Sequence, residues 1–190
     1  MRVLRCRLDG LTIIEPDLHR DERGFFVETY RRAWHAHAGI PAAQEFIQDN
    51  HSRSARAVVR GMHFHIGPGV AKLVRCARGR ILDVAVDLRR GSPTYAQWEA
   101  FELDSETLRE LYLPVGFAHG FCVLSDLADV LYKQTAYYDP ALERSLAWDD
   151  PDIAVQWPLP AAELIVSERD SSAPRLRELA GELPFVYRSA

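Results

Sequence analysis

The feature that most constrains the fold is a succession of short stretches rich in β-branched and aromatic residues. Clusters of turn-forming residues such as RRGSPTY and LDSET separate most of them. Regularly spaced strands with little helix are typical of a β-sandwich or barrel, and a double-stranded jelly roll is a good candidate. The predicted fold class is therefore all-β. The predicted strands lie within residues 11–16, 24–30, 71–79, 80–90, 97–104, 109–114, 118–126 and 129–138.

Residues 80–90 carry the strand signal most clearly. Apolar side chains at every second position from 82 to 88 alternate with Asp83 and Asp87. This alternation predicts an antiparallel strand that is half-buried, with the aspartates on the face opposite the apolar residues.

Helical signals are few, so we expect only short peripheral helices. One candidate spans residues 30–39 and is closed by Gly39. Another spans residues 172–181, opened by a serine cap and Pro174 and closed by Gly181. Residues 148–170 are rich in proline, and we expect them to form an irregular segment around the barrel or across its mouth.

Composition and charge narrow the class of protein. The 190 residues suit one domain, residues 1–190, with a sizeable core. The net charge of −4 gives no indication of a nucleic-acid groove, and no apolar run is long enough to span a bilayer. The N-terminus lacks a signal-peptide core, and three scattered cysteines fit neither a disulfide framework nor a zinc knuckle. We therefore expect a cytoplasmic protein without nucleic-acid or membrane partners.

Three histidines and one lysine are the candidate functional residues. His63 and His65 stand one residue apart in a predicted strand, so both can point to one face, and Lys72 follows seven positions later. His119 follows a Pro-x-Gly turn. A lone histidine in a strand is more often a hydrogen-bonded wall residue. Three of them near one predicted barrel mouth, with a lysine, favour either a metal site or proton transfer.

This arrangement resembles the cupin family, in which a His-x-His strand, a downstream glutamate and a Pro-x-Gly-x-x-His strand hold a metal ion. Counted back from Gly79 by the family's spacing, the glutamate position falls on Lys72. A lysine ammonium donates protons, cannot ligate while charged and repels a divalent ion. The loop before Lys72 is also longer than in metal-binding cupins. The resemblance thus gives weak support to a metal, although three histidines alone can bind zinc.

Longer motifs narrow the resemblance from cupins in general to one family. The stretches DERGFFVETY, QDNHS, RGMHFH, AKLVRCARGRILDVAVDLRRGSPTYAQW, LYLPVGFAHGFCVLSD, LYKQTAYYDP and WDDPDIAVQWP resemble the dTDP-4-dehydrorhamnose 3,5-epimerase family from about residue 12 to about residue 175. The resemblance implies a cupin jelly roll without metal or other cofactor, usually a homodimer. It implies a dTDP-4-keto-6-deoxy sugar as substrate, whose C3 and C5 are inverted in dTDP-L-rhamnose or related deoxysugar biosynthesis.

The resemblance also implies roles for the site residues. His63 is the base, a role that suits an imidazole, and Asp170 is the carboxylate on its far nitrogen. Tyr132 is the acid on the opposite face of the sugar. The enolate formed at the C4 ketone needs stabilisation, which Lys72 can supply as a cation, with His119 near the same oxygen.

Further residues match substrate-binding positions of the family. Arginine binds oxyanions in a bidentate manner, and two arginines match pyrophosphate positions. The strand around residues 23–30 often reaches into the partner's site in the family, so the dimer is expected to be functional. The matched residues are Arg23, Glu28, Gln48, Asn50, Arg60, Glu143 and Arg169, and Tyr138 is expected to pack or touch substrate.

Two departures from the family pattern, and three alternatives to the 3,5-epimerase, remain at this point. His65 stands where the family often has glutamine, and Arg169 where it commonly has lysine. Besides the 3,5-epimerase, the sequence leaves open an enzyme that inverts C3 only or C5 only, a metal-dependent cupin enzyme, and a cupin that binds sugar nucleotide without turnover. The last would lack a base–acid pair, whereas His63 and Tyr132 are both present.

Overall fold

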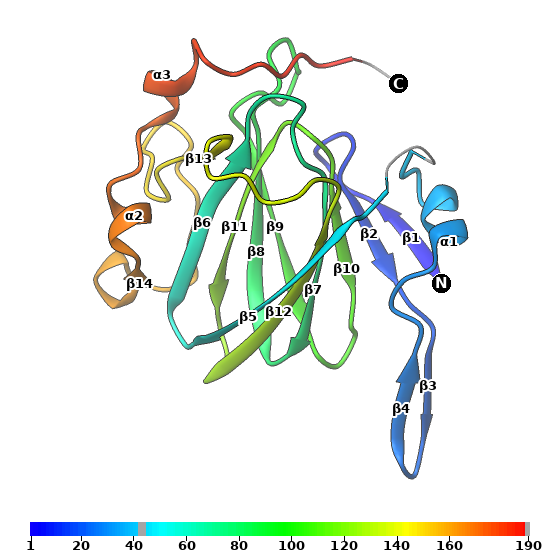
Figure 1. The fold of residues 1–190 in the computed structure, drawn as a ribbon. Coiled ribbons are helices and arrows are strands. Elements are labelled where there is room, and N and C mark those ends of the chain that lie inside the picture. The colour runs from blue at the N-terminus through cyan, green and yellow to red at the C-terminus, as the bar shows by residue number, and fades with distance from the viewer. Residues whose placement is uncertain (42–44, 189–190) are drawn as a thin grey trace.

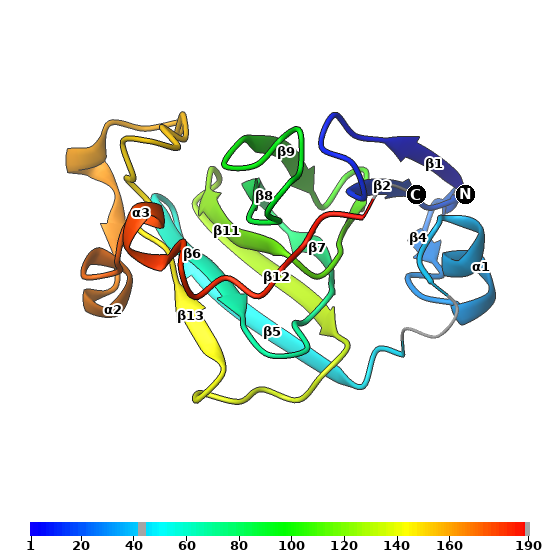
Figure 2. The same ribbon diagram turned by 90° about the horizontal axis from the view of Figure 1, so that it is seen from above.

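The structure is a computed structural model that describes residues 1–41 and 45–188, and within them two six-stranded sheets face each other (Figures 1 and 2). The predicted all-β fold is confirmed. The first sheet consists, in order, of β1 (Arg2–Arg5), β2 (Thr12–Glu15), β10 (Glu110–Leu113), β7 (Lys72–Arg78), β12 (Leu127–Gln134) and β5 (Gln48–Ala55). The second consists of β13 (Glu143–Ser145), β6 (Val58–His65), β11 (Phe117–Val123), β8 (Arg80–Asp87) and β9 (Trp98–Asp104), with β14 (Ile165–Val166) in parallel beside β6.

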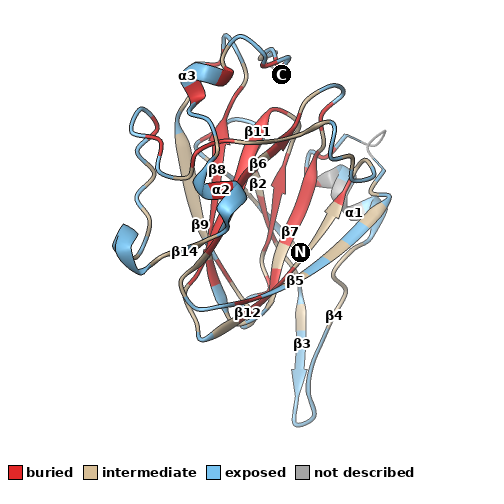
Figure 3. Ribbon diagram, turned by 60° about the vertical axis from the view of Figure 1, so that its left-hand side comes forward, coloured by how far each residue is buried: buried red, intermediate tan, exposed pale blue. Residues whose placement is uncertain are grey.

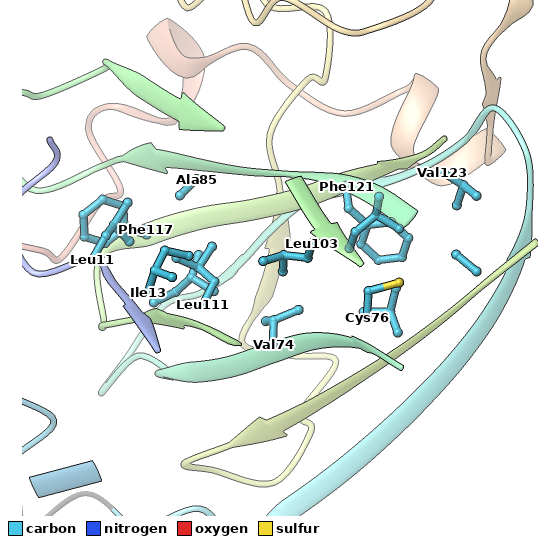
Figure 4. Close-up of a cluster of buried hydrophobic side chains, with 14 of the residues drawn as sticks. Leu11, Ile13, Val74, Cys76, Ala85, Leu103, Leu111, Phe117, Phe121 and Val123 are labelled. Carbon is cyan, nitrogen blue, oxygen red and sulfur yellow. The ribbon is translucent and has the colours of Figure 1, made fainter. Parts of the chain in front are cut away.

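The main core lies between the two sheets. Successive side chains of a strand point to opposite faces, so every second residue of each strand enters this layer. Val74 of β7, Leu103 of β9 and Leu111 of β10 meet there without exposed surface (Figure 4). Burial is greatest along the central strands and lowest in the hairpin described below (Figure 3).

Strand β8 is buried on both faces, so the prediction of a half-buried strand is wrong. Its apolar face packs under the C-terminal segment, where Val84 and Val86 join a cluster with Leu179. That segment runs across the molecule beyond α3 (Leu176–Leu179), as its red trace shows (Figures 1 and 2). The opposite face, which carries Asp83 and Asp87, turns towards the interior, and both aspartates are fully buried.

The helices are short and peripheral, as predicted. Helix α1 (Arg32–His37) lies within the first predicted segment. In the second, the predicted start is wrong, because Ser172 ends the preceding helix α2 (Glu168–Ser171) and Arg175 caps α3. Residues 148–170 are largely irregular, as predicted, and include η1 (Ala161–Glu163), β14 and the start of α2. No helix in the described part of the chain combines the length and the apolar character needed to cross a membrane.

A two-stranded hairpin of β3 (Leu18–Asp21) and β4 (Gly24–Val27) projects from the body of the molecule (Figure 1). Its two phenylalanines are solvent-exposed, Phe25 by 50% and Phe26 by 70%. Exposed aromatic residues on a projecting element are typical of a surface that contacts another molecule.

Candidate active site

A cavity of about 240 Å³ is lined by residues of both sheets and of α2. The first sheet contributes residues of β5, β7 and β12, and the second contributes residues of β6, β11 and β13. The cavity thus gathers residues that lie far apart in the sequence. Its lining consists of Ser52, Arg60, His63, Lys72, His119, Phe121, Tyr132, Tyr138, Glu143 and Arg169.

His63 is held by a carboxylate from outside the main sheets. Its Nε2 lies 2.7 Å from Oδ1 of Asp170, which sits on α2 and is 4% exposed. Ser167 caps α2 and its hydroxyl accepts a hydrogen bond from the Asp170 amide, while the amide of Gly61 donates to Oδ2 of Asp170 at 3.3 Å. Burial raises the pKa of Asp170, but the hydrogen bonds from His63 and Gly61 outweigh it and leave that pKa below its ordinary value. An ionised Asp170 therefore accepts a hydrogen bond from the Nε2–H of His63, which leaves Nδ1 of His63 with a lone pair.

A second histidine–carboxylate pair lies beside the first. His119 of β11 is directly opposite His63 of β6 in the sheet. Its Nε2 lies 3.0 and 2.9 Å from the two carboxylate oxygens of Asp83 on β8. His119 pairs with Ala85 in the sheet, and Asp83 stands two residues along on the same face. The carboxylate is fully buried and fixes both the tautomer and the orientation of the ring.

Lys72 brings a positive charge into this cavity at the start of β7, where only 7% of the residue is exposed. Burial lowers the pKa of Lys72 to about 8, against the opposing effect of the carboxylates of Glu143 and Asp83. The lysine is therefore cationic at neutral pH but loses its proton far more readily than a lysine in water.

Tyr132 of β12 lines the same cavity as the two histidines. Burial, and then the carboxylate of Glu143, raises the pKa of Tyr132. The phenol consequently stays protonated at neutral pH and is available as a proton donor.

Charged and aromatic side chains complete the rim. Arg169 of α2 forms an ion pair with Glu143 of β13 at 2.6 Å, next to Tyr138 in the loop before β13. Arg60 donates a hydrogen bond from Nε to the hydroxyl of Ser54 at 2.9 Å. Arg60 is exposed to solvent. Arginine and lysine outnumber the carboxylate on the lining, so the cavity suits an anionic ligand.

Gln48 and Asn50 are not on the lining, although both were predicted to bind substrate. They form an amide network with Gln134, in which Gln48 and Asn50 each donate to the Gln134 carbonyl at 3.2 Å. The carbonyl of Gln48 also accepts a hydrogen bond from the amide of Tyr138 at 2.8 Å. In this structure the network fixes the loop that carries Tyr138.

Arg23 and Glu28, the remaining predicted substrate-binding residues, also lie outside the cavity. Arg23 sits at the turn of the projecting hairpin and pairs with Asp21. Glu28 follows that hairpin and pairs with Arg31. The structure therefore does not bring these two residues to the cavity of their own chain.

Sequence reasoning missed Asp83, Ser52, Phe121 and Gln134. For Asp83 the available signal was its place in an alternating strand, but that strand was predicted to be half-buried, whereas the face that carries Asp83 is buried. In the described ranges, no group of three or more His, Cys, Asp or Glu side chains is placed so that it could hold a metal ion.

Comparison with known proteins identifies the family of this chain. The sequence profile of the dTDP-4-dehydrorhamnose 3,5-epimerase family matches residues 5–178. The chain belongs to this family. The dTDP-4-dehydrorhamnose 3,5-epimerase of Pseudomonas aeruginosa is 47% identical over 171 residues, covering 90% of this chain and 93% of the relative. The dTDP-4-dehydrorhamnose 3-epimerase of Streptomyces niveus is 42% identical over 187 residues, covering 97% of this chain and 89% of the relative.

A solved structure of the family is similar over almost its whole length. The dTDP-6-deoxy-D-glucose-3,5-epimerase of Legionella pneumophila, in complex with dTDP-4-keto-L-rhamnose, has a TM-score of 0.93 and 41% identity, covering 99% of both chains. The expected cupin-type jelly roll is confirmed by this likeness. Membership of the dTDP-4-dehydrorhamnose 3,5-epimerase family also confirms the predicted enzyme class, the isomerases.

Proposed function

We propose that this chain inverts C3 and C5 of a dTDP-4-keto-6-deoxyglucose to give dTDP-4-keto-L-rhamnose. The observation that carries the proposal is the convergence of a histidine–aspartate pair and a protonated tyrosine on one cationic cavity. Inversion next to a ketone needs a base, an acid on the other face and a group that holds the enolate charge. The described cavity offers all three.

Proton removal is assigned to His63. Nδ1 takes the proton from a carbon next to the C4 ketone, and the electron pair of the broken C–H bond moves into the enolate. Asp170 stabilises the imidazolium that forms and holds the ring in place. The charge on the C4 oxygen is stabilised by the ammonium of Lys72 and by the ring of His119, which Asp83 orients.

Reprotonation is assigned to Tyr132. Its phenol donates a proton to the carbanion centre from the opposite face, and the phenolate regains a proton from solvent. His63 returns its proton to solvent before the second centre reacts. The same pair of side chains can serve C3 and C5 in turn, because both carbons are adjacent to the same C4 ketone.

The nucleotide is expected to use the cationic rim. Arg60 is exposed at the cavity and, among the described residues, donates a hydrogen bond to Ser54 through Nε, so its two terminal nitrogens remain accessible to a pyrophosphate. The Legionella relative with bound dTDP-4-keto-L-rhamnose supports a dTDP-linked sugar as ligand of this chain as well.

We also propose that two copies of the chain form a dimer in the cytoplasm. Arg23 and Glu28 can contribute to substrate binding only in a cavity other than their own, and the projecting hairpin with exposed Phe25 and Phe26 could carry them there. The three cysteines are all free thiols, in keeping with a reducing compartment.

A C3-only epimerase is the second candidate, favoured by the likeness to the Streptomyces niveus 3-epimerase. Proton NMR of dTDP-4-keto-6-deoxyglucose with the enzyme in D₂O separates the two. Deuterium at both C3 and C5 with the L-rhamno product supports the proposal, deuterium at C3 alone supports the alternative, and no exchange contradicts both. A His63→Ala preparation, purified in the same way, gives the baseline for non-enzymatic exchange.

A further inference from the structure

His65 is a buried histidine that the proposed mechanism does not use. It is 4% exposed, and in residues 1–41 and 45–188 neither Nδ1 nor Nε2 has a hydrogen-bond partner. Leaving a buried polar atom unpaired is costly, so an imidazole of this kind calls for an explanation such as a ligand, a water or a moving neighbour.

The surroundings of His65 keep it neutral. Burial, and then the charge of Lys72, lowers the pKa of His65. His65 pairs with Glu143 across β6 and β13, and its ring meets Tyr138 edge-to-face at 6.3 Å between centroids. The charged and titratable groups around it are His63 on its own strand, Lys72 on β7, Glu143 on β13, and Tyr138 and Asp139 in the preceding loop. A neutral imidazole keeps one nitrogen with a lone pair, which is a hydrogen-bond acceptor.

In the described part of the chain, Lys72 lacks hydrogen-bond acceptors, whereas His65 lacks a donor. Its ammonium carries three donors, yet no hydrogen bond from it to an acceptor is found within the described ranges. The carboxylates of Glu143 and Asp83 act on it through space. The other charged or titratable residues on the cavity lining are His63, His119, Tyr132, Tyr138, Arg60 and Arg169. An ammonium at the cavity without an acceptor among the described residues and a buried imidazole without a donor thus lie within each other's electrostatic reach.

We propose that His65 is a positioning residue for Lys72, whose ammonium donates a hydrogen bond to the neutral imidazole through one buried water. One water with several polar partners is the usual solution where two buried groups of opposite kind fall short of contact. The contact keeps the lysine charged and fixes the orientation of its ammonium group. Its catalytic meaning rests on the proposed function, in which Lys72 stabilises the enolate.

The two lysines of the chain, Lys72 and Lys133, permit a direct test. Protein carrying [6-¹³C]lysine gives two side-chain signals, and Lys133→Arg assigns them. In His65→Leu the titration midpoint of Lys72 should fall by about one pH unit, because a hydrogen bond to a charged group stabilises it by at least that much. In His65→Gln, whose amide oxygen is an acceptor, the midpoint should stay near the wild-type value. The surface signal of Lys133, paired with Asp49, should not move.

An unchanged Lys72 midpoint in His65→Leu overturns the proposal, as does an equal fall in the Leu and Gln variants. Should His65→Leu not fold, the reverse experiment remains: in ¹⁵N-histidine protein, Lys72→Met should shift the ring nitrogen signals of His65, and unchanged signals overturn the contact. These measurements use the free protein and no turnover. Failure of the epimerase assignment would appear instead in the D₂O exchange experiment, so the two failures are distinguishable.

Discussion

In the proposed mechanism, catalysis begins at the nitrogen of His63 that Asp170 leaves free. In His63→Asn this nitrogen is lost while a polar side chain of smaller volume remains. We expect isotope exchange at every reactive centre to fall by ~10²–10⁴-fold, the contribution of a positioned general base. Exchange is measured by NMR in D₂O, with circular dichroism to verify the fold. Wild-type exchange rates in this variant would assign the base to another residue.

Substitution of Tyr132 is expected to separate isotope exchange from inversion. Tyr132→Phe keeps the ring and removes only the proton donor, so the enolate still forms and His63 can return a deuteron to the original face. We expect deuterium incorporation to persist while inversion slows by ~10²-fold or more. Tyr95→Phe is the matched control, because Tyr95 is partly buried in the cluster outside the second sheet. Undiminished inversion, or loss of both processes in a folded variant, contradicts the assignment.

We expect the charge of Lys72 to set the alkaline limit of activity. Its pKa of about 8 means that the ammonium is present below that pH and is lost as the pH rises through it. We therefore expect kcat to decline above about pH 8, as enolate stabilisation disappears. Lys72→Arg keeps its charge to far higher pH, so this variant should be slower but should lose the decline. Lys133→Arg should leave the pH profile as it is. A decline that persists in Lys72→Arg would have another origin.

At the scale of elements, the pairing of β6 with β11 holds His63 and His119 opposite each other. The strands approach closely at Gly61, where a Cβ would lie 2.6 Å from the Cα of Gly120 and φ is +115°. Gly61→Ala should lower the free energy of unfolding by about 1–3 kcal/mol or more and reduce turnover, because the strands must separate. Gly181→Ala, where nothing lies within 4 Å, is the control for urea denaturation. Equal stability of the two variants contradicts this reading.

Strand β5 shows why part of the fold escaped sequence analysis. Its residues, QDNHSRSA, contain no β-branched or aromatic side chain, so they carry no strand signal. The reason is the site itself: Ser52 lines the cavity, and Gln48 and Asn50 join the amide network. A strand that faces a polar cavity does not show hydrophobic alternation. The apolar strands β7, β8 and β10, in contrast, were predicted near their observed positions.

At the scale of the whole molecule, the pair of His63 and Asp170 spans 107 residues of sequence. No spacing rule predicts such a contact, and Asp170 was expected at the site only through family resemblance. The C-terminal segment also explains the error at β8, because it covers the apolar face and leaves the aspartates inside. Local patterns predicted the strands, whereas the long-range packing decided which of their faces forms the site.

The proposed dimer can be tested by mixing two impaired variants. A hairpin variant, Arg23→Ala with Glu28→Ala, keeps His63 but lacks the residues that would reach the partner's cavity. His63→Ala lacks the base but keeps an intact hairpin. If the hairpin serves the partner, a mixed dimer contains one complete site, formed by His63 of one chain and the hairpin of the other.

Co-refolding equal amounts of the two variants should then restore roughly a quarter of wild-type activity, since half of the dimers are mixed and each has one of two sites complete. Each variant refolded alone is the control, and light scattering establishes that dimers form. Activity that never exceeds the mean of the two separate preparations means that Arg23 and Glu28 act within their own chain or not at all. A monomer in solution would contradict the shared site directly, because the hairpin contributes no residue to the lining of its own cavity and would have no second cavity to enter.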